Sequence, residues 1–176
     1  GLGFGEDGTI WGGEFLLADY SEAKRVARFK PIAMIGGAQA IRMPWRNTYA
    51  HILNTMTWDE YQANYAGTEL AEFFTNQPLS IINRMIEEGV NVPLASSCGR
   101  LFDAVTAAVG ICREQARFEG QGAIEFENLV DMTSSDIDQP YPFAIDDETT
   151  TAGEQILTIN SAPMWHSLLQ DLAQNV

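Results

Sequence analysis

The amino-acid sequence predicts an α+β fold in which an N-terminal β-hairpin is followed by a mainly helical middle. Three observations support this fold class. The first 35 residues are rich in glycine, aromatic and β-branched residues, which are typical of turns and strands. From Ala38 onward the apolar residues follow helical spacing. With 176 residues, 45% of them hydrophobic, the chain is long enough to build one domain with a core.

A β-hairpin is expected at the N-terminus. Its first strand spans Thr9–Tyr20, entered through a turn at Glu6–Gly8, and its second spans Ala23–Ile35. Pro31 argues against a helix in the second strand, because proline disrupts helix interiors. Four basic residues of that strand are expected to decorate an exposed face: Lys24, Arg25, Arg28 and Lys30.

The middle of the chain predicts a series of short helices. Four are expected at Trp45–Met56, Trp58–Tyr65, Glu69–Thr75 and Leu79–Glu88. Thr57 and Glu60 have the spacing of a capping box at the start of the second helix. Gly89 follows the fourth helix, where a glycine commonly ends the helical conformation.

The stretch SSCGRLFDAVTAAVGIC predicts the clearest helix of the chain. Ser96 or Ser97 caps its start, and Gly110 ends it. Asp103 is expected on the polar flank of this helix. Its apolar face is expected to consist of Leu101, Phe102, Val105 and Val109.

The last third of the chain predicts both helices and strands. A helix is expected over Gly122–Met132, and the acidic stretch Thr133–Gly153 is expected to be mostly loop with a strand candidate at Tyr141–Ile145. A further strand is expected at Gln155–Asn160, followed by a last helix at Pro163–Gln174.

The charge of the chain is strongly acidic and uneven. The formal net charge is −14, and residues 118–176 contain eleven acidic residues and no Lys or Arg. Such a surface repels nucleic acid and anionic lipid, so neither is an expected partner.

No apolar run approaches the roughly 20 residues that span a bilayer. Cys98 and Cys112 lack the C-x-x-C spacing of zinc or redox sites, which favours a reducing, cytoplasmic setting.

The opening glycines allow two interpretations. Gly1, Gly3 and Gly5 could let the backbone approach a phosphate, because glycine has no Cβ and exposes its N–H group. No helix follows them as in a dinucleotide-binding fingerprint, and no P-loop lysine is present. The spacing therefore favours a structural hairpin.

Metal binding and thiol chemistry are not expected from this chain by itself. His51 and His166 are the two histidines and lie far apart, whereas a metal site needs several convergent ligands. Cys98 lies near a helix start, a place that lowers thiol pKa values, but no histidine is near it in sequence. A small packed residue is the favoured interpretation of Cys98.

Two further groups of residues could bind a ligand. Arg42 and Arg46 flank the start of a helix and could either hold a phosphate or carbamoyl group or pair with the acidic half of the chain. Asp103 is followed seventeen residues later by the glycine turn at Gly120 and then by Glu125. A carboxylate and a glycine turn at this separation could both face a ribose.

Four stretches agree with one known family. These are GLGFGEDGTIWGGEFLLADY, GGAQAIRMPWR, SSCGRLFDAVTAAVGIC and FEGQGAIEFE. Together they resemble the C-terminal carbamoyltransferase domain of HypF-type hydrogenase maturation proteins, in order from the first residue to about residue 127. The resemblance implies a TsaD-like domain of the actin/Hsp70/sugar-kinase nucleotide-binding fold.

The resemblance also implies an activity. HypF-type enzymes use ATP and carbamoyl phosphate to make a carbamoyl adenylate, and pass the carbamoyl group to the C-terminal cysteine of the partner HypE. The product is then converted to the cyanide ligand of the nickel–iron centre. Two alternatives remain open: an O-carbamoyltransferase that acts on a small-molecule hydroxyl, and a non-catalytic module that docks onto a protein.

Some residue roles carry over with the resemblance. Gly1 and Gly3 match the phosphate-proximal loop, whose aspartate would precede the chain. The positions that contact the nucleoside in TsaD-like relatives are matched by Asp103, Gly120 and Glu125. The lysine that follows the aspartate in those relatives is replaced by Ala104, so no phosphate contact is expected there. A HypF-type arginine motif contains Arg42 and Arg46, the candidates for the carbamoyl or phosphate group.

The resemblance covers only part of a full HypF protein. Residues 1–176 are therefore expected to be a single partial domain, the central part of the C-terminal carbamoyltransferase domain. A divalent metal is expected in the full-length protein, held by histidines upstream of the opening loop. By itself the chain is expected to be inactive.

Overall fold

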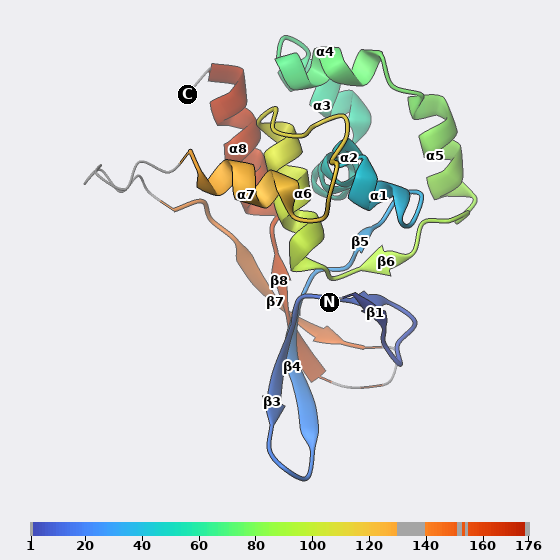
Figure 1. Ribbon diagram of the computed structural model, residues 1–176, viewed down its shortest axis with the longest axis vertical. Helices are drawn as coiled ribbons and strands as arrows, with labels where there is room; N and C mark the ends of the chain where they lie inside the picture. The colour runs from blue at the N-terminus through green and yellow to red at the C-terminus, as the bar shows by residue number, and fades with distance from the viewer. Residues whose placement is uncertain (1, 130–139, 151–152, 154, 175–176) are drawn as a thin grey trace.

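The computed structural model describes residues 2–129, 140–150, 153 and 155–174 (Figure 1). Within them, the helices gather at one end of the molecule and the hairpin β3–β4 extends away at the other. The predicted α+β class, with an N-terminal hairpin before a helical middle, is confirmed. In the described part of the chain, no helix has the length and apolar character needed to cross a bilayer.

The strands form two four-stranded sheets. The first sheet has the order β1 (Gly3–Phe4), β2 (Ile10–Trp11), β6 (Leu94–Ala95) and β5 (Ile32–Ala33). The second sheet has the order β3 (Glu14–Ala18), β4 (Ala23–Phe29), β8 (Gln155–Asn160) and β7 (Ala144–Thr149). Strands β3 and β4 are antiparallel, and β4 and β8 are parallel.

The two predicted N-terminal strands are each divided between the two sheets. The hairpin pairing is confirmed, but the expectation of one strand over Thr9–Tyr20 is wrong, because the chain changes sheet at Gly12 and Gly13. A Cβ on Gly13 would lie 2.2 Å from the carbonyl oxygen of Ser96, so only glycine allows this crossing. The expected strand Ala23–Ile35 likewise breaks before Pro31 and continues as β5.

The helices agree closely with the sequence pattern. Their bounds are α1 (Gln39–Arg42), α2 (Trp45–Thr55), α3 (Trp58–Tyr65), α4 (Glu69–Thr75), α5 (Leu79–Glu87), α6 (Cys98–Ala108), α7 (Gln121–Glu127) and α8 (Ala162–Gln174). The capping box of Thr57 and Glu60 is present. Helix α7 is shorter than expected, and Met132 lies outside the described residues. The strand expected at Tyr141–Ile145 is found further along, as β7.

The core lies where α2 packs against α6 and α8. The small side chains of Ala104 and Ala108 let α6 approach α2 closely, and the hydroxyl of Thr48 donates a hydrogen bond of 2.8 Å to the carbonyl oxygen of Ala104. Trp45 and Trp165 are fully buried in the same core. Close approach of the two helices fixes which side of α6 faces inward.

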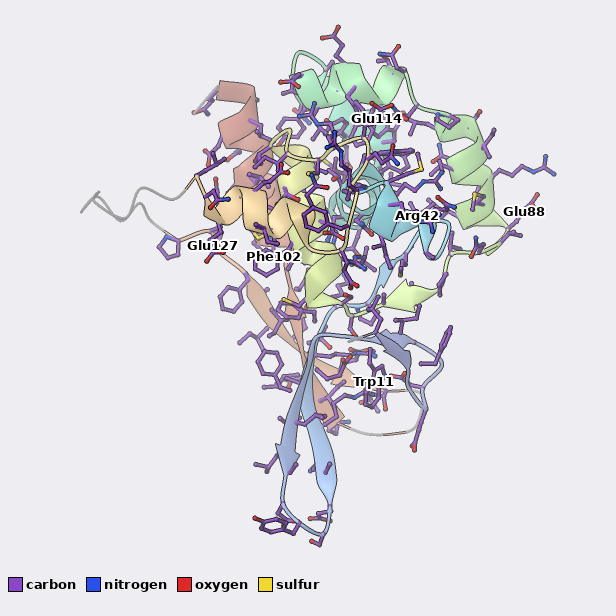
Figure 2. All side chains as sticks on the ribbon, in the orientation of Figure 1. Trp11, Arg42, Glu88, Phe102, Glu114 and Glu127 are labelled. Carbon is purple, nitrogen blue, oxygen red and sulfur yellow. The ribbon has the colours of Figure 1, made fainter. Side chains whose placement is uncertain are left out.

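The inward side of α6 differs from the expected one. Phe102 was expected to be buried, but it is 49% exposed and lies on the outer side of the helix (Figure 2). Asp103 was expected on the polar flank, but it is 6% exposed. Both expectations are wrong because Ala104 and Ala108, rather than the largest apolar residues, pack against α2. Leu101, Val105 and Val109 are partly buried at the edges of the contact.

A buried charge network joins the two sheets. Arg25 and Arg28 were expected to be exposed, but their guanidinium nitrogens lie 2.9 and 3.1 Å from Oδ2 of Asp7. A register shift between β3 and β4 skips Val26, so that both arginines reach the same face of the sheet. Arg28 also pairs with Glu148 at 2.7 Å. The sequence pattern missed this network because Asp7 lies in a turn far from the arginines in sequence.

Replacing Asp7 with asparagine is expected to destabilise the fold by about 3 kcal/mol, because it leaves two buried arginines without their shared carboxylate. Burial opposes ionisation of Asp7, but hydrogen bonds from Trp11, Thr9 and Arg25 lower its pKa below the ordinary range. The ionised carboxylate of Asp7 therefore stabilises the fold fully above the unfolded-state pKa of about 4. This stabilisation is lost as the pH falls from there toward the lower pKa of the folded state. Denaturant unfolding at pH 7 and pH 3 measures both effects.

A matched control for Asp7→Asn is Glu88→Gln, which breaks the exposed pair of Glu88 with Arg84 on α5. This control is expected to change the free energy of unfolding by less than about 0.5 kcal/mol. Equal effects of the two variants, or an Asp7→Asn deficit that does not shrink at pH 3, would contradict the assignment.

Candidate functional site

Hydrogen bonds join the start of α6 to the segment at the first sheet. The hydroxyl of Ser97 accepts a hydrogen bond of 3.3 Å from the backbone N–H of Arg100 and caps the helix. The N–H of Cys98 donates to the carbonyl oxygen of Gly12 at 3.3 Å. Because α2 holds one side of α6 and β2 holds its start, the side chains along α6 have fixed directions.

Asp103 lies in the second turn of α6 and forms a buried ion pair with Arg100. Its Oδ2 is 2.7 Å from Nε of Arg100, one turn earlier on the same helix. Burial raises the pKa of Asp103, Arg100 counteracts that rise, and nearby Glu119 adds to it. The carboxylate is thus held by one cation in a place with little water.

Helix α7 packs directly onto α6. Gly120 precedes α7 with a φ of 79°, a left-handed conformation that suits glycine, and this turn directs α7 back along α6. A Cβ on Gly122 would lie 2.6 Å from Oγ1 of Thr106, so α7 approaches α6 as closely as a glycine allows. The close packing brings the first turn of α7 beside the residues that follow α6.

Glu125 lies on α7 in contact with the segment that follows α6. Its carboxylate accepts hydrogen bonds from Gln121 Nε2 at 2.7 Å and from Cys112 Sγ at 3.3 Å. The hydrogen bond from Gln121 contributes most to lowering the pKa of Glu125. Burial raises the pKa of Cys112 to about 11, and the carboxylates of Glu125 and Asp103 contribute to this rise. The structure therefore brings Asp103, Gly120 and Glu125 into one region.

The two candidate arginines lie at different distances from this region. Arg42 is exposed on α1 (Figure 2), and its carbonyl oxygen accepts a hydrogen bond of 2.9 Å from the N–H of Ala116, in the segment leading to Gly120. Arg46 is half-buried with its guanidinium carbon 5.3 Å from the ring centre of Trp45, and burial lowers its pKa. In the described part of the chain, neither arginine forms an ion pair with an acidic residue.

The glycines of the opening loop lie on the first sheet. Gly1 is outside the described residues, and Gly3 belongs to β1, where it lines an open depression with Gly12, Gly13 and Glu14. The N–H groups of Gly12 and Gly13 donate to Oε2 of Glu14 at 2.7 and 3.0 Å. These two amides are therefore already occupied by the carboxylate of Glu14. A phosphate could bind them only by displacing that carboxylate.

Metal ligands do not gather in the described residues. His51 is buried and stacked on Trp165 with ring centres 5.2 Å apart, whereas His166 is exposed. Across the residues that the structure places, no group of three or more His, Cys, Asp or Glu could hold a metal ion. The divalent metal implied by the resemblance therefore has no fitting ligand set here, and no chemical step of this chain is derived from it.

Arg100 is the residue of this region that sequence reasoning missed. It stands three positions before Asp103, which is the spacing at which two helical side chains meet. That spacing was readable from the sequence, but the burial of the pair depends on how α6 sits against α2. Cys112, beside Glu125, gave no sequence signal because the turn between the helices brings it there.

Replacing Glu125 with glutamine is expected to lower the pKa of Cys112 from about 11, because a neighbouring carboxylate disfavours the thiolate. Only part of the shift is removed, since burial is its largest cause. The pH dependence of iodoacetamide alkylation measures the change, in a Cys98→Ser background so that one thiol reacts. An unchanged alkylation profile would place Glu125 away from Cys112, and Glu127→Gln on the same helix is the control.

A family model described as the second subdomain of the carbamoyltransferase Kae1-like domain matches residues 1–176. The carbamoyltransferase HypF of Rhodobacter capsulatus is 42% identical over 142 residues, which cover 80% of this chain and 18% of that protein. The carbamoyltransferase HypF2 of Cupriavidus necator is 37% identical over 143 residues, covering 81% of this chain and 16% of that protein. The chain thus spans less than a fifth of these relatives.

Solved structures agree with the sequence relatives. A full-length HypF in a phosphate- and nucleotide-bound form is similar over 100% of this chain and 21% of its own, with a TM-score of 0.80 and 29% identity. HypF of T. kodakarensis has the same fold over 98% of this chain, with a TM-score of 0.71 and 23% identity. The family match, the relatives and the fold agree, and the chain belongs to the HypF carbamoyltransferase family as the second subdomain of its Kae1-like domain.

Proposed function

We propose that the chain is one part of a longer cytoplasmic carbamoyltransferase that acts in hydrogenase maturation. The enzyme uses ATP and carbamoyl phosphate to form a carbamoyl adenylate, and transfers the carbamoyl group to the C-terminal cysteine of a HypE-type acceptor. The observation that carries the proposal is the meeting of Asp103, Gly120 and Glu125 at the α6–α7 contact. It occurs in a chain that shares its fold with a nucleotide-bound HypF.

In this proposal α6 and α7 bind the nucleoside end of ATP. The carboxylates of Asp103 and Glu125 can accept hydrogen bonds from ribose hydroxyls, which are donors. Gly120 has no side chain and a left-handed backbone, so the chain there can pass close to a ligand. Helix α6 is held by the core and α7 packs onto α6, which gives such contacts a fixed geometry.

Arg42 and Arg46 are proposed to act on the carbamoyl or phosphate group. Transfer forms a bond between the carbamoyl carbon and the cysteine sulfur, and breaks the bond between that carbon and the adenylate oxygen. AMP and the thiol proton are released. Negative charge grows on the carbonyl oxygen and the departing phosphate, and a guanidinium stabilises both. Arg42 is the better placed, because it is exposed beside the segment that leads to Gly120.

The proposal is tested by Asp103→Asn in the full-length protein that carries this chain. Loss of a hydrogen bond to a charged acceptor removes about 1.5–3 kcal/mol, so the KM for ATP in carbamoyl-phosphate-dependent ATP turnover is expected to rise about 10- to 100-fold. An unchanged KM would remove Asp103 from the nucleotide site. Thermal unfolding checks that the variant is folded at the assay temperature.

A second variant guards against misfolding, because Asp103 is buried. Glu125 is exposed, so Glu125→Gln should leave the fold intact while raising the KM for ATP. Glu127→Gln, an exposed change two residues further along the same helix, is expected to leave turnover unchanged. Equal KM values for the Glu125 and Glu127 variants would argue against a nucleoside contact of α7.

A further inference from the structure

We propose that Arg100 is a positioning residue that holds the carboxylate of Asp103 in the orientation in which it meets the nucleotide. The inference rests on the proposed function, because it assigns a role to Arg100 at the same site. Arg100 is as buried as Asp103, and in this proposal it acts through the carboxylate of Asp103 rather than on the nucleotide.

The geometry of the pair supports this role. Both residues are 6% exposed, and Nε of Arg100 lies 2.7 Å from Oδ2 of Asp103. Within the described residues, Asp103 is the only acidic side chain within ion-pair distance of Arg100. The contact is an ion pair without hydrogen-bond geometry, so Arg100 acts on Asp103 by charge and draws its carboxylate toward the guanidinium.

The other side of the guanidinium is enclosed by the protein. Arg100 lines a small cavity of about 20 Å³ together with His51, Asn47 and Ser97. Nη1 of Arg100 and Nδ1 of His51 are both buried and make no hydrogen bond to another described residue. Burial lowers the pKa of His51 to about 3, so its ring is neutral and leaves Asp103 as the charged partner of Arg100.

The size and lining of the cavity fit one water molecule. A cavity needs roughly 10–15 Å³ to hold a water, and the water needs polar partners. A water there can accept a hydrogen bond from Nη1 of Arg100 and donate one to Nδ1 of His51. Together with the ion pair to Asp103, such a water would satisfy a second nitrogen of the guanidinium.

A double-mutant cycle in the full-length protein separates positioning from a merely structural ion pair. Titration calorimetry measures the affinity for ATP. The variants are Arg100→Met, Arg100→Lys, Asp103→Asn and the double variant Arg100→Met/Asp103→Asn. All are measured at a temperature where circular dichroism shows each to be folded. We expect about 10-fold weaker ATP binding for Arg100→Met and about 3-fold for Arg100→Lys. The double variant should bind no more weakly than Asp103→Asn. The KM for carbamoyl phosphate should not change.

A matched control is Arg84→Met, which removes an exposed arginine on α5 and is expected to leave ATP binding unchanged. Wild-type affinity in a folded Arg100→Met, or additive losses in the double variant, overturns the inference while the proposed function stands. Wild-type affinity in Asp103→Asn overturns both. If Arg100→Met does not fold, Arg100→Lys decides: a loss of about 3-fold supports positioning, and unchanged binding overturns it.

Discussion

The packing of α6 against α2 is the constraint on which the rest of the site depends. Ala104 and Ala108 allow the two helix backbones to come close, and the hydrogen bond from Thr48 fixes their register. This contact turns Arg100 and Asp103 inward, although both are charged. Since an unpaired buried charge is costly, the two side chains must be paired with one another. The ion pair is thus a consequence of the alanine face and not an independent feature.

Local signals were readable from the sequence, and contacts between distant segments were not. The capping box of Thr57 and Glu60 lies within four residues, so the start of α3 was predicted correctly. The division of the first expected strand at Gly13 depends on Ser96, more than eighty residues away. The same reason explains why Arg25 and Arg28 were expected at the surface.

The candidate site was also predicted only in part from the sequence. The resemblance to HypF-type proteins picked out Asp103, Gly120 and Glu125 together, and the structure brings their segments into one region. The helical pattern nevertheless placed Asp103 on the wrong side of α6, because it assigned the inward face to the largest apolar residues. A helix that packs against another through alanines breaks that rule, and Phe102 remains outside as a result.

Charge constrains how ATP can lie in the proposed enzyme. The α6–α7 region carries the carboxylates of Asp103 and Glu125 with Glu119 nearby, and its cations are Arg100, which is paired with Asp103, and Arg117. The same carboxylates attract hydroxyl donors, which favours the ribose at this place. In the proposed enzyme the triphosphate points toward cationic side chains. Arg42 is the proposed cation, because its backbone contacts the segment that leads to Gly120 and its side chain makes no ion pair with any residue that the structure describes. In this proposal the carboxylates of α6 and α7 select the nucleoside end of ATP, and cationic side chains direct its phosphates.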